Sequence, residues 1–152
     1  MTMTDVAAEI KTLDIAKEER IDAPIEIVFE TILEEIGPKN VGGQNSSPMP
    51  MKLEAWPGGR WFRDLGNNAG HFWGNIQVIK PPTLLEICGP MFMSYPGANH
   101  ISYRLKADGK ATVLSFRHRG MGLILDEHAT GVRQGWAQIL ERIAKAAAAK
   151  RK

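Results

Sequence analysis

The chain has 152 residues, a hydrophobic fraction of 43% and a formal net charge of +2. This length is typical of one domain with a packed core, and the basic residues are too scattered to predict a nucleic-acid site. One cysteine, Cys88, excludes an internal disulfide, and no apolar run approaches the roughly 20 residues of a membrane span, so we expect a cytoplasmic protein.

The first third of the chain predicts a strand, a helix and a loop. Apolar and polar residues alternate over Leu13–Ile21, and the charged stretch Lys17–Arg20 favours an edge strand. Apolar residues then recur at helical spacing over Ile25–Ile36, and Gly37-Pro38 ends that helix. Residues 39–50 are rich in Gly, Asn, Ser and Pro, which predicts a loop or one short turn of helix. This segment is either a functional lid or a plain connector.

The next 70 or so residues predict about six short strands separated by turns. Asp108-Gly109 is a strong hairpin signal, and residues 91–99 are expected to form a loop. Successive strands with tight turns pair antiparallel. The expected strands are 51–56, 60–65, 71–80, 83–88, 100–106 and 111–119.

The last stretch, from about Asp126 to Ala149, predicts a long amphipathic helix. Its apolar side carries Leu125, Ala129, Val132, Trp136, Ile139, Leu140, Ile143 and Ala147. Its polar side carries Arg133, Gln134, Gln138, Glu141, Arg142 and Lys145. Because an isolated helix of this kind is unstable in water, the strands upstream have to cover its apolar side.

This order of elements predicts an α+β fold. A curved antiparallel sheet of about six to seven strands would wrap around the long C-terminal helix in two layers. We expect a single domain over residues 11–150, preceded by a flexible or helical extension over residues 1–10.

Several motifs in this order resemble one known superfamily. They are Ile21–Phe29 after the first strand, Pro57–Trp61, Gly74–Leu84, Thr112–His118 and Gly131–Trp136 in the final helix. Together they resemble the helix-grip, or START-like (SRPBCC), superfamily, and within it the branch named for the activator of heat shock protein 90 ATPase. The resemblance covers about residues 12–146. It implies a helix-grip fold with a cavity between sheet and long helix that holds a small apolar, aromatic or lipid-like ligand.

Eight residues are candidates for the lining of that cavity. Tyr103 and Arg63 offer hydrogen bonds to an acidic or carbonyl group, and Gly135 permits close approach of the sheet or of a ligand. For each candidate a structural role is the competing interpretation, such as a core tryptophan or a buried histidine bonded to a neighbour. The candidates are Trp61, Arg63, Trp73, Tyr103, Phe116, His118, Gly135 and Trp136.

Catalytic motifs are not recognisable in the sequence. There is no nucleophile elbow, no metal-ligand spacing and no phosphate-binding glycine loop, so we expect no catalytic residue, metal or cofactor. A binding protein is therefore favoured, and both a monomer and a homodimer remain open.

The resemblance leaves two alternative functions open. One is an enzyme of the polyketide cyclase or dehydratase type, in which His118, Tyr103 and Arg63 orient a carbonyl or shuttle a proton. The other is a co-chaperone-like stress-response protein that binds a chaperone. This second alternative rests on the family name alone.

Overall fold

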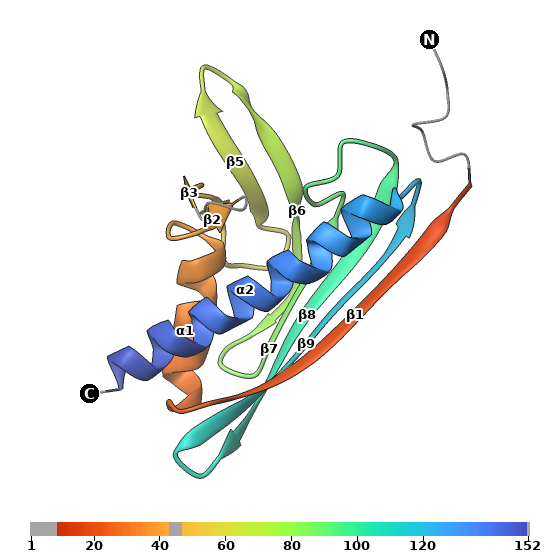
Figure 1. The fold of residues 1–152 in the computed structure, drawn as a ribbon. Coiled ribbons are helices and arrows are strands. Elements are labelled where there is room, and N and C mark those ends of the chain that lie inside the picture. Colours follow the sequence, from red (N-terminus) through yellow and green to blue (C-terminus); the bar gives the residue numbers. More distant parts are fainter. Residues whose placement is uncertain (1–8, 43–46, 152) are drawn as a thin grey trace.

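A computed structural model describes residues 9–42 and 47–151 (Figure 1). The expected extension over residues 1–10 lies outside the described residues, apart from Glu9 and Ile10. No helix in the described part of the chain is long and apolar enough to cross a membrane. The elements are β1 (Lys11–Ile21), α1 (Ile25–Ile36), β2 (Val41–Gly42), β3 (Ser47–Pro48), β4 (Lys52–Leu53), β5 (Arg60–Gly66), β6 (Ala69–Lys80), β7 (Leu84–Gly89), β8 (Gly97–Asp108), β9 (Ala111–Gly122) and α2 (Asp126–Lys150).

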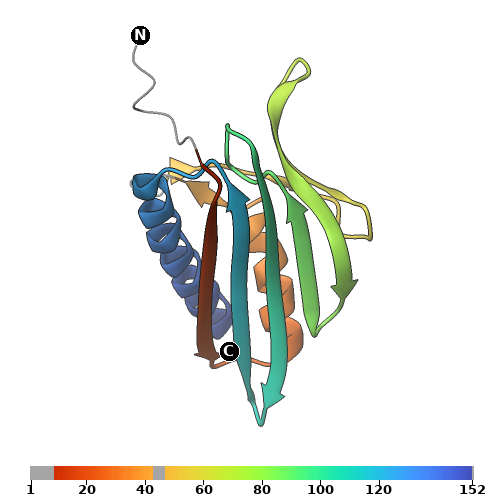
Figure 2. The same cartoon turned by 90° about the vertical axis from the view of Figure 1, so that its right-hand side faces the viewer.

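Seven strands form one antiparallel sheet in the order β1-β9-β8-β7-β6-β5-β4, and β2 pairs with β3 separately. The first strand, β1, lies at one edge beside β9, as its charged sequence predicts. Both helices lie against the same side of the sheet, and α2 crosses it at a slant (Figures 1 and 2). The predicted helix-grip α+β fold, with a curved sheet around a long C-terminal helix, is confirmed.

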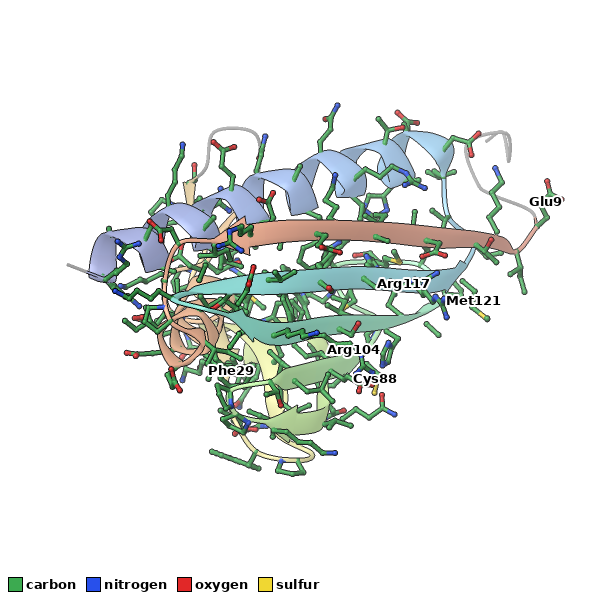
Figure 3. The ribbon with its side chains drawn as sticks, turned by 90° about the horizontal axis from the view of Figure 1, so that it is seen from below. Glu9, Phe29, Cys88, Arg104, Arg117 and Met121 are labelled. Atoms are coloured by element: carbon green, nitrogen blue, oxygen red, sulfur yellow. The ribbon has the colours of Figure 1, made fainter. Side chains whose placement is uncertain are left out.

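The sheet face that meets the helices is apolar because buried and exposed side chains alternate along β8 and β9. Arg104 and Arg117 alternate with the buried residues and are exposed on the outer face (Figure 3). The buried residues of β8 and β9 on this face include Ile101, Tyr103, Leu105, Leu114, Phe116 and His118. The buried residues of α2 are Val132, Trp136, Leu140, Ile143 and Ala147.

Strand β6 departs from the strict alternation of a regular strand. Alternation places Trp73 and Ile76 on opposite faces, but both side chains are buried. The pairing with β5 shifts its register between Trp61 and Phe62, which leaves Trp73 as the extra residue of a β-bulge. Such a bulge re-aims a side chain, and here it brings the Trp73 indole to the helix side of the sheet.

The predicted strand over residues 51–56 is shorter than expected, since only Lys52 and Leu53 pair with β5. At Glu54 the chain turns, because the Glu54 carboxylate accepts hydrogen bonds from Nε and Nη2 of Arg60 at 2.8 and 2.7 Å. It also accepts one from the Arg60 backbone N–H at 2.8 Å. These bonds lower the pKa of Glu54 to about 2 and fix the start of β5, where the next residue, Trp61, enters the core.

Candidate functional site

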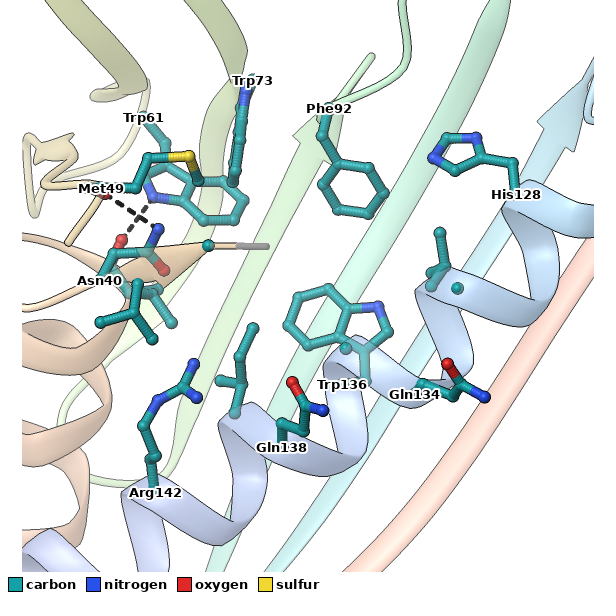
Figure 4. Close-up of a pocket in the computed structure, with 17 residues that line it drawn as sticks. Asn40, Met49, Trp61, Trp73, Phe92, His128, Gln134, Trp136, Gln138 and Arg142 are labelled. Atoms are coloured by element: carbon teal, nitrogen blue, oxygen red, sulfur yellow. Dashed lines mark hydrogen bonds between the residues drawn. The ribbon is translucent and has the colours of Figure 1, made fainter. Parts of the chain in front are cut away.

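A cavity of about 410 Å³ lies between α2 and the part of the sheet formed by β5 and β6 (Figure 4). The end of α1, the β2–β3 segment and the loop between β7 and β8 provide its remaining walls. This volume lies within the range of small-molecule sites in proteins, roughly 300–1,000 Å³.

One wall of the cavity is a row of aromatic rings. The Trp61 and Trp73 ring centroids lie 5.0 Å apart, and Trp73 lies 5.4 Å from Phe92. Phe92 in turn lies 5.9 Å from His128 at the start of α2. All of these pairs meet edge to face, a favourable geometry for aromatic groups, so the wall is ordered by its own contacts.

The indole N–H groups in this wall already have partners. Nε1 of Trp61 donates to the carbonyl oxygen of Ile36 at 2.8 Å, and Nε1 of Trp73 donates to Nδ1 of His71 at 3.2 Å. Both rings can therefore offer apolar surface to the cavity without leaving a buried donor unpaired.

Two loops contribute residues to the cavity wall. The Asn40 side chain donates to the Met49 carbonyl at 3.1 Å, and the Met49 N–H donates to the Asn40 carbonyl at 2.9 Å. In the loop before β8, Met91 has a φ of 59° and is buried, and its N–H donates to the Trp73 carbonyl at 2.7 Å. The next residue, Phe92, lines the cavity (Figure 4).

The wall formed by α2 contains two glycines, Gly131 and Gly135, one turn apart beside Trp136. Apart from the adjacent residues and the backbone of α2 itself, a Cβ atom built on either glycine would meet no atom within 4 Å. Of the two roles predicted for Gly135, close approach of the sheet is not seen, because no sheet atom lies within 4 Å of such a Cβ. Close approach of a ligand stays a prediction. Both glycines line the cavity, and the space beside them is open, Gly135 being half-buried and Gly131 exposed.

A polar stripe of α2 borders the same cavity. Gln134, Gln138 and Arg142 follow one another at intervals of four residues, which places them on one face of the helix. Both glutamines are exposed, whereas Arg142 is half-buried. Figure 4 shows the Arg142 side chain extending from α2 toward the loop that carries Asn40.

Behind the cavity wall, Trp136 belongs to a buried polar chain. Its Nε1 donates to Nδ1 of His118 at 2.9 Å, so the His118 proton sits on Nε2 and is donated to Oδ1 of Asn99 at 2.7 Å. Nδ2 of Asn99 donates to the carbonyls of Gly89 and Pro90 at 3.4 and 3.3 Å. Burial lowers the pKa of His118 to about 4, so the imidazole is neutral at pH 7.

The structure brings some of the predicted cavity residues to the cavity and leaves others outside it. The residues that line it are Trp61, Trp73, Gly135 and Trp136. The predicted residues that do not line it are Arg63, Tyr103, Phe116 and His118.

The four residues outside the cavity have different surroundings. The Phe116 ring packs 4.5 Å from Trp136, and the Tyr103 ring lies 5.1 Å from Phe116, one layer farther from the cavity. The Tyr103 hydroxyl is buried without a hydrogen-bond partner among the described residues, and burial raises its pKa. His118 is fully buried, and Arg63 lies half-buried on β5.

Several lining residues were not among the sequence candidates. Phe92 and His128 flank the aromatic wall, and Arg142 stands at the polar border. The periodicity of the helix alone places Arg142 on its polar side, facing solvent. The signal that could have found it is the lack of an acidic residue three or four positions away on either side.

Among the described residues, no group of three His, Cys, Asp or Glu side chains is placed to hold a metal ion. The groups around the cavity are thus suited to apolar contact and to a few hydrogen bonds.

Comparison with known protein families shows the family of this chain. Residues 22–148 match a family model described as activator of Hsp90 ATPase homolog 1-like protein. The chain belongs to this family. The match includes α1, both cavity loops and nearly all of α2, so the cavity lies inside the part shared with other activator of Hsp90 ATPase homolog 1-like proteins. No curated protein sequence matches the chain.

Solved structures share the fold at low sequence identity. CalU16 from Micromonospora echinospora is 22% identical with a TM-score of 0.58, over 90% of this chain and 81% of that one. Mll3558 from Rhizobium loti is 17% identical with a TM-score of 0.67, over 90% and 98% of the two chains. DynU16, a protein in the dynemicin biosynthetic locus, is 12% identical with a TM-score of 0.60, over 87% of this chain and 46% of that one. These likenesses establish the common helix-grip architecture.

Proposed function

We propose that this activator of Hsp90 ATPase homolog 1-like protein binds a small, mostly apolar or aromatic molecule in the cavity between α2 and β5–β6. Trp61, Trp73 and Trp136 would contact the ligand, and Gly135 would lie against it. Family membership and the aromatic lining support this proposal.

The observation that carries it is the open space beside Gly131 and Gly135. Glycine inside a helix is less favourable than alanine by about 1 kcal/mol, so each glycine weakens α2. A packing reason would be a close neighbour from another element, yet neither missing Cβ would meet such an atom within 4 Å. Two glycines that weaken the helix and leave a space open are understandable if a ligand occupies that space.

The enzyme and co-chaperone alternatives have less support. The residues that a cyclase-like reaction would need, Arg63, Tyr103 and His118, do not line the cavity. The co-chaperone role rests on the family name, and we propose no chaperone surface. The lone Cys88 favours a reducing compartment such as the cytoplasm as the place of ligand binding.

A fluorescent apolar probe tests the proposal. N-phenylnaphthylamine is neutral, aromatic and nearly dark in water, and its emission rises when it enters an apolar site. We expect saturable binding by the purified protein. Gly135→Leu fills the cavity and should weaken that binding by about tenfold or more, equivalent to about 1.4 kcal/mol.

Ala137→Leu is the matched control. Ala137 is exposed on the same helix, so this variant adds a leucine of the same size outside the cavity. It should bind the probe as the parent protein does. Absence of saturable binding by the parent protein, or equal binding by Gly135→Leu, would show that the cavity is not a ligand site.

A further inference from the structure

Arg142 is the one arginine that borders the cavity, and it has no partner among the described residues. No hydrogen bond or ion pair joins its guanidinium to any described group. It is nevertheless half-buried, which removes part of the water that would otherwise solvate its charge.

Most of the other arginines in the described residues have a partner, unlike Arg142. Arg133 donates to the backbone carbonyl of Asp14, and Arg63 is unpaired but does not line the cavity. All the others form an ion pair with a described carboxylate. Their partners are Asp14, Asp22, Glu54, Glu86 and Asp108.

The sequence of α2 leaves Arg142 unpaired within its own helix. The positions that could reach it are occupied by Gln138, Ile139, Lys145 and Ala146, none of which is acidic. The neighbouring Glu141 instead pairs with Lys145 at 2.8 Å on the outer side. The guanidinium is therefore left to face the cavity side, where Gln138 adds a side-chain amide one turn away.

We propose that Arg142 binds an anionic group of the ligand, which makes the ligand an aromatic or apolar acid. This inference rests on the proposed function and names the class of ligand. A guanidinium matches the geometry of a carboxylate or sulfonate, and such charge-assisted hydrogen bonds are among the strongest available to a ligand.

The geometry also sets the shape of that ligand. Arg142 follows Gly135 by seven positions, so two turns of α2, about 10 Å, lie between the open aromatic end and the cationic end. A ring placed against Gly135 and Trp73 would then need its acidic group at the far end of the molecule.

The test uses a matched pair of probes that differ in one charged group. Anilinonaphthalenesulfonate carries a sulfonate that N-phenylnaphthylamine lacks. We expect Arg142→Gln to weaken binding of the sulfonate by about tenfold or more, as expected for charge-assisted bonds, and to change binding of the neutral probe by less than about twofold. Added salt should weaken binding of the sulfonate somewhat and binding of the neutral probe not at all, because an ion pair at the half-buried Arg142 is partly screened.

Two further variants make the result specific. Arg133→Gln makes the same charge change on the same helix outside the cavity and should leave both probes unaffected. Arg63→Gln examines the other unpaired arginine, and a loss confined to that variant would assign the anion to β5 and overturn the proposal.

The remaining outcomes separate the two proposals. If the neutral probe binds and the sulfonate binds Arg142→Gln as it binds the parent, the cavity is a ligand site but Arg142 is not its anion site. If Arg142→Gln weakens both probes equally, its role is structural and the inference fails. If neither probe binds the parent protein, the proposed function fails with it.

Discussion

Helix α2 has different surroundings on the two sides of Trp136. On one side the helix packs against β9, where Trp136 touches Phe116 and bonds to His118. On the other side Gly131 and Gly135 face the cavity, and the aromatic rings of β5 and β6 stand across it. One helix thus serves as core on one flank and as cavity wall on the other.

The difference shows that adjacent faces of one helix can carry the residues of a packed core and those of a cavity wall. The packed flank uses branched and aromatic side chains, whereas the open flank uses glycine next to glutamine and arginine. The β-bulge at Trp73 adds the facing wall. Substitutions on the two flanks should therefore behave differently, and this gives three tests.

Phe116→Ala should produce the largest effect. Phe116 is buried between Tyr103 and Trp136, and truncating such a phenylalanine costs about 3–5 kcal/mol of unfolding free energy. Phe92→Ala removes the same side chain from the half-buried cavity wall and should cost less than half as much. Urea denaturation of both variants measures the difference. Equal losses would mean that the cavity side is packed as tightly as the core.

The burial of His118 on the packed flank predicts that the stability of the protein depends on pH. Its pKa is lowered by burial to about 4, whereas an unfolded histidine has a pKa of about 6.5. As the pH falls below 6.5 the unfolded chain gains a proton that the folded chain does not, so stability decreases. The slope is about 1.4 kcal/mol per pH unit, and the full loss by pH 4 is about 3 kcal/mol.

Denaturation between pH 6.5 and 5 measures this slope before paired carboxylates such as Asp14 and Glu34, whose pKa values are lowered, begin to protonate. His118→Gln is the control, because glutamine cannot titrate and still offers a donor and an acceptor. An unchanged slope in His118→Gln would mean that another group titrates.

The strand and helix pattern of the fold could be predicted from the sequence because its periodicities are local. The alternation along β9 and the stripe of α2 both follow from adjacent residues. The cavity depends on features that are not local. The bulge at Trp73 arises from pairing with β5. The inward position of Phe92 follows Met91, whose backbone has a left-handed conformation in the loop before β8.

The candidate site shows the same limit. His118 and Phe116 share an apolar strand face with the core, and only the position of α2 decides that Trp136 separates them from the cavity. Arg142 is polar and lies outside the apolar stripe, so a rule that places charges in water passes over it.

Gly135→Ala should have the smallest and opposite effect. The new methyl group enters open space in the cavity, so the helix gains up to about 1 kcal/mol from the better propensity of alanine. Gly74→Ala is the contrasting control, because its Cβ would lie 2.7 Å from the Cys88 carbonyl oxygen and should destabilise the sheet. Thermal denaturation compares the two, and a loss of stability in Gly135→Ala would contradict the open flank. If Gly135→Ala is more stable and yet binds N-phenylnaphthylamine less tightly, then glycine at this position weakens the helix in favour of the cavity, as expected where function and stability compete.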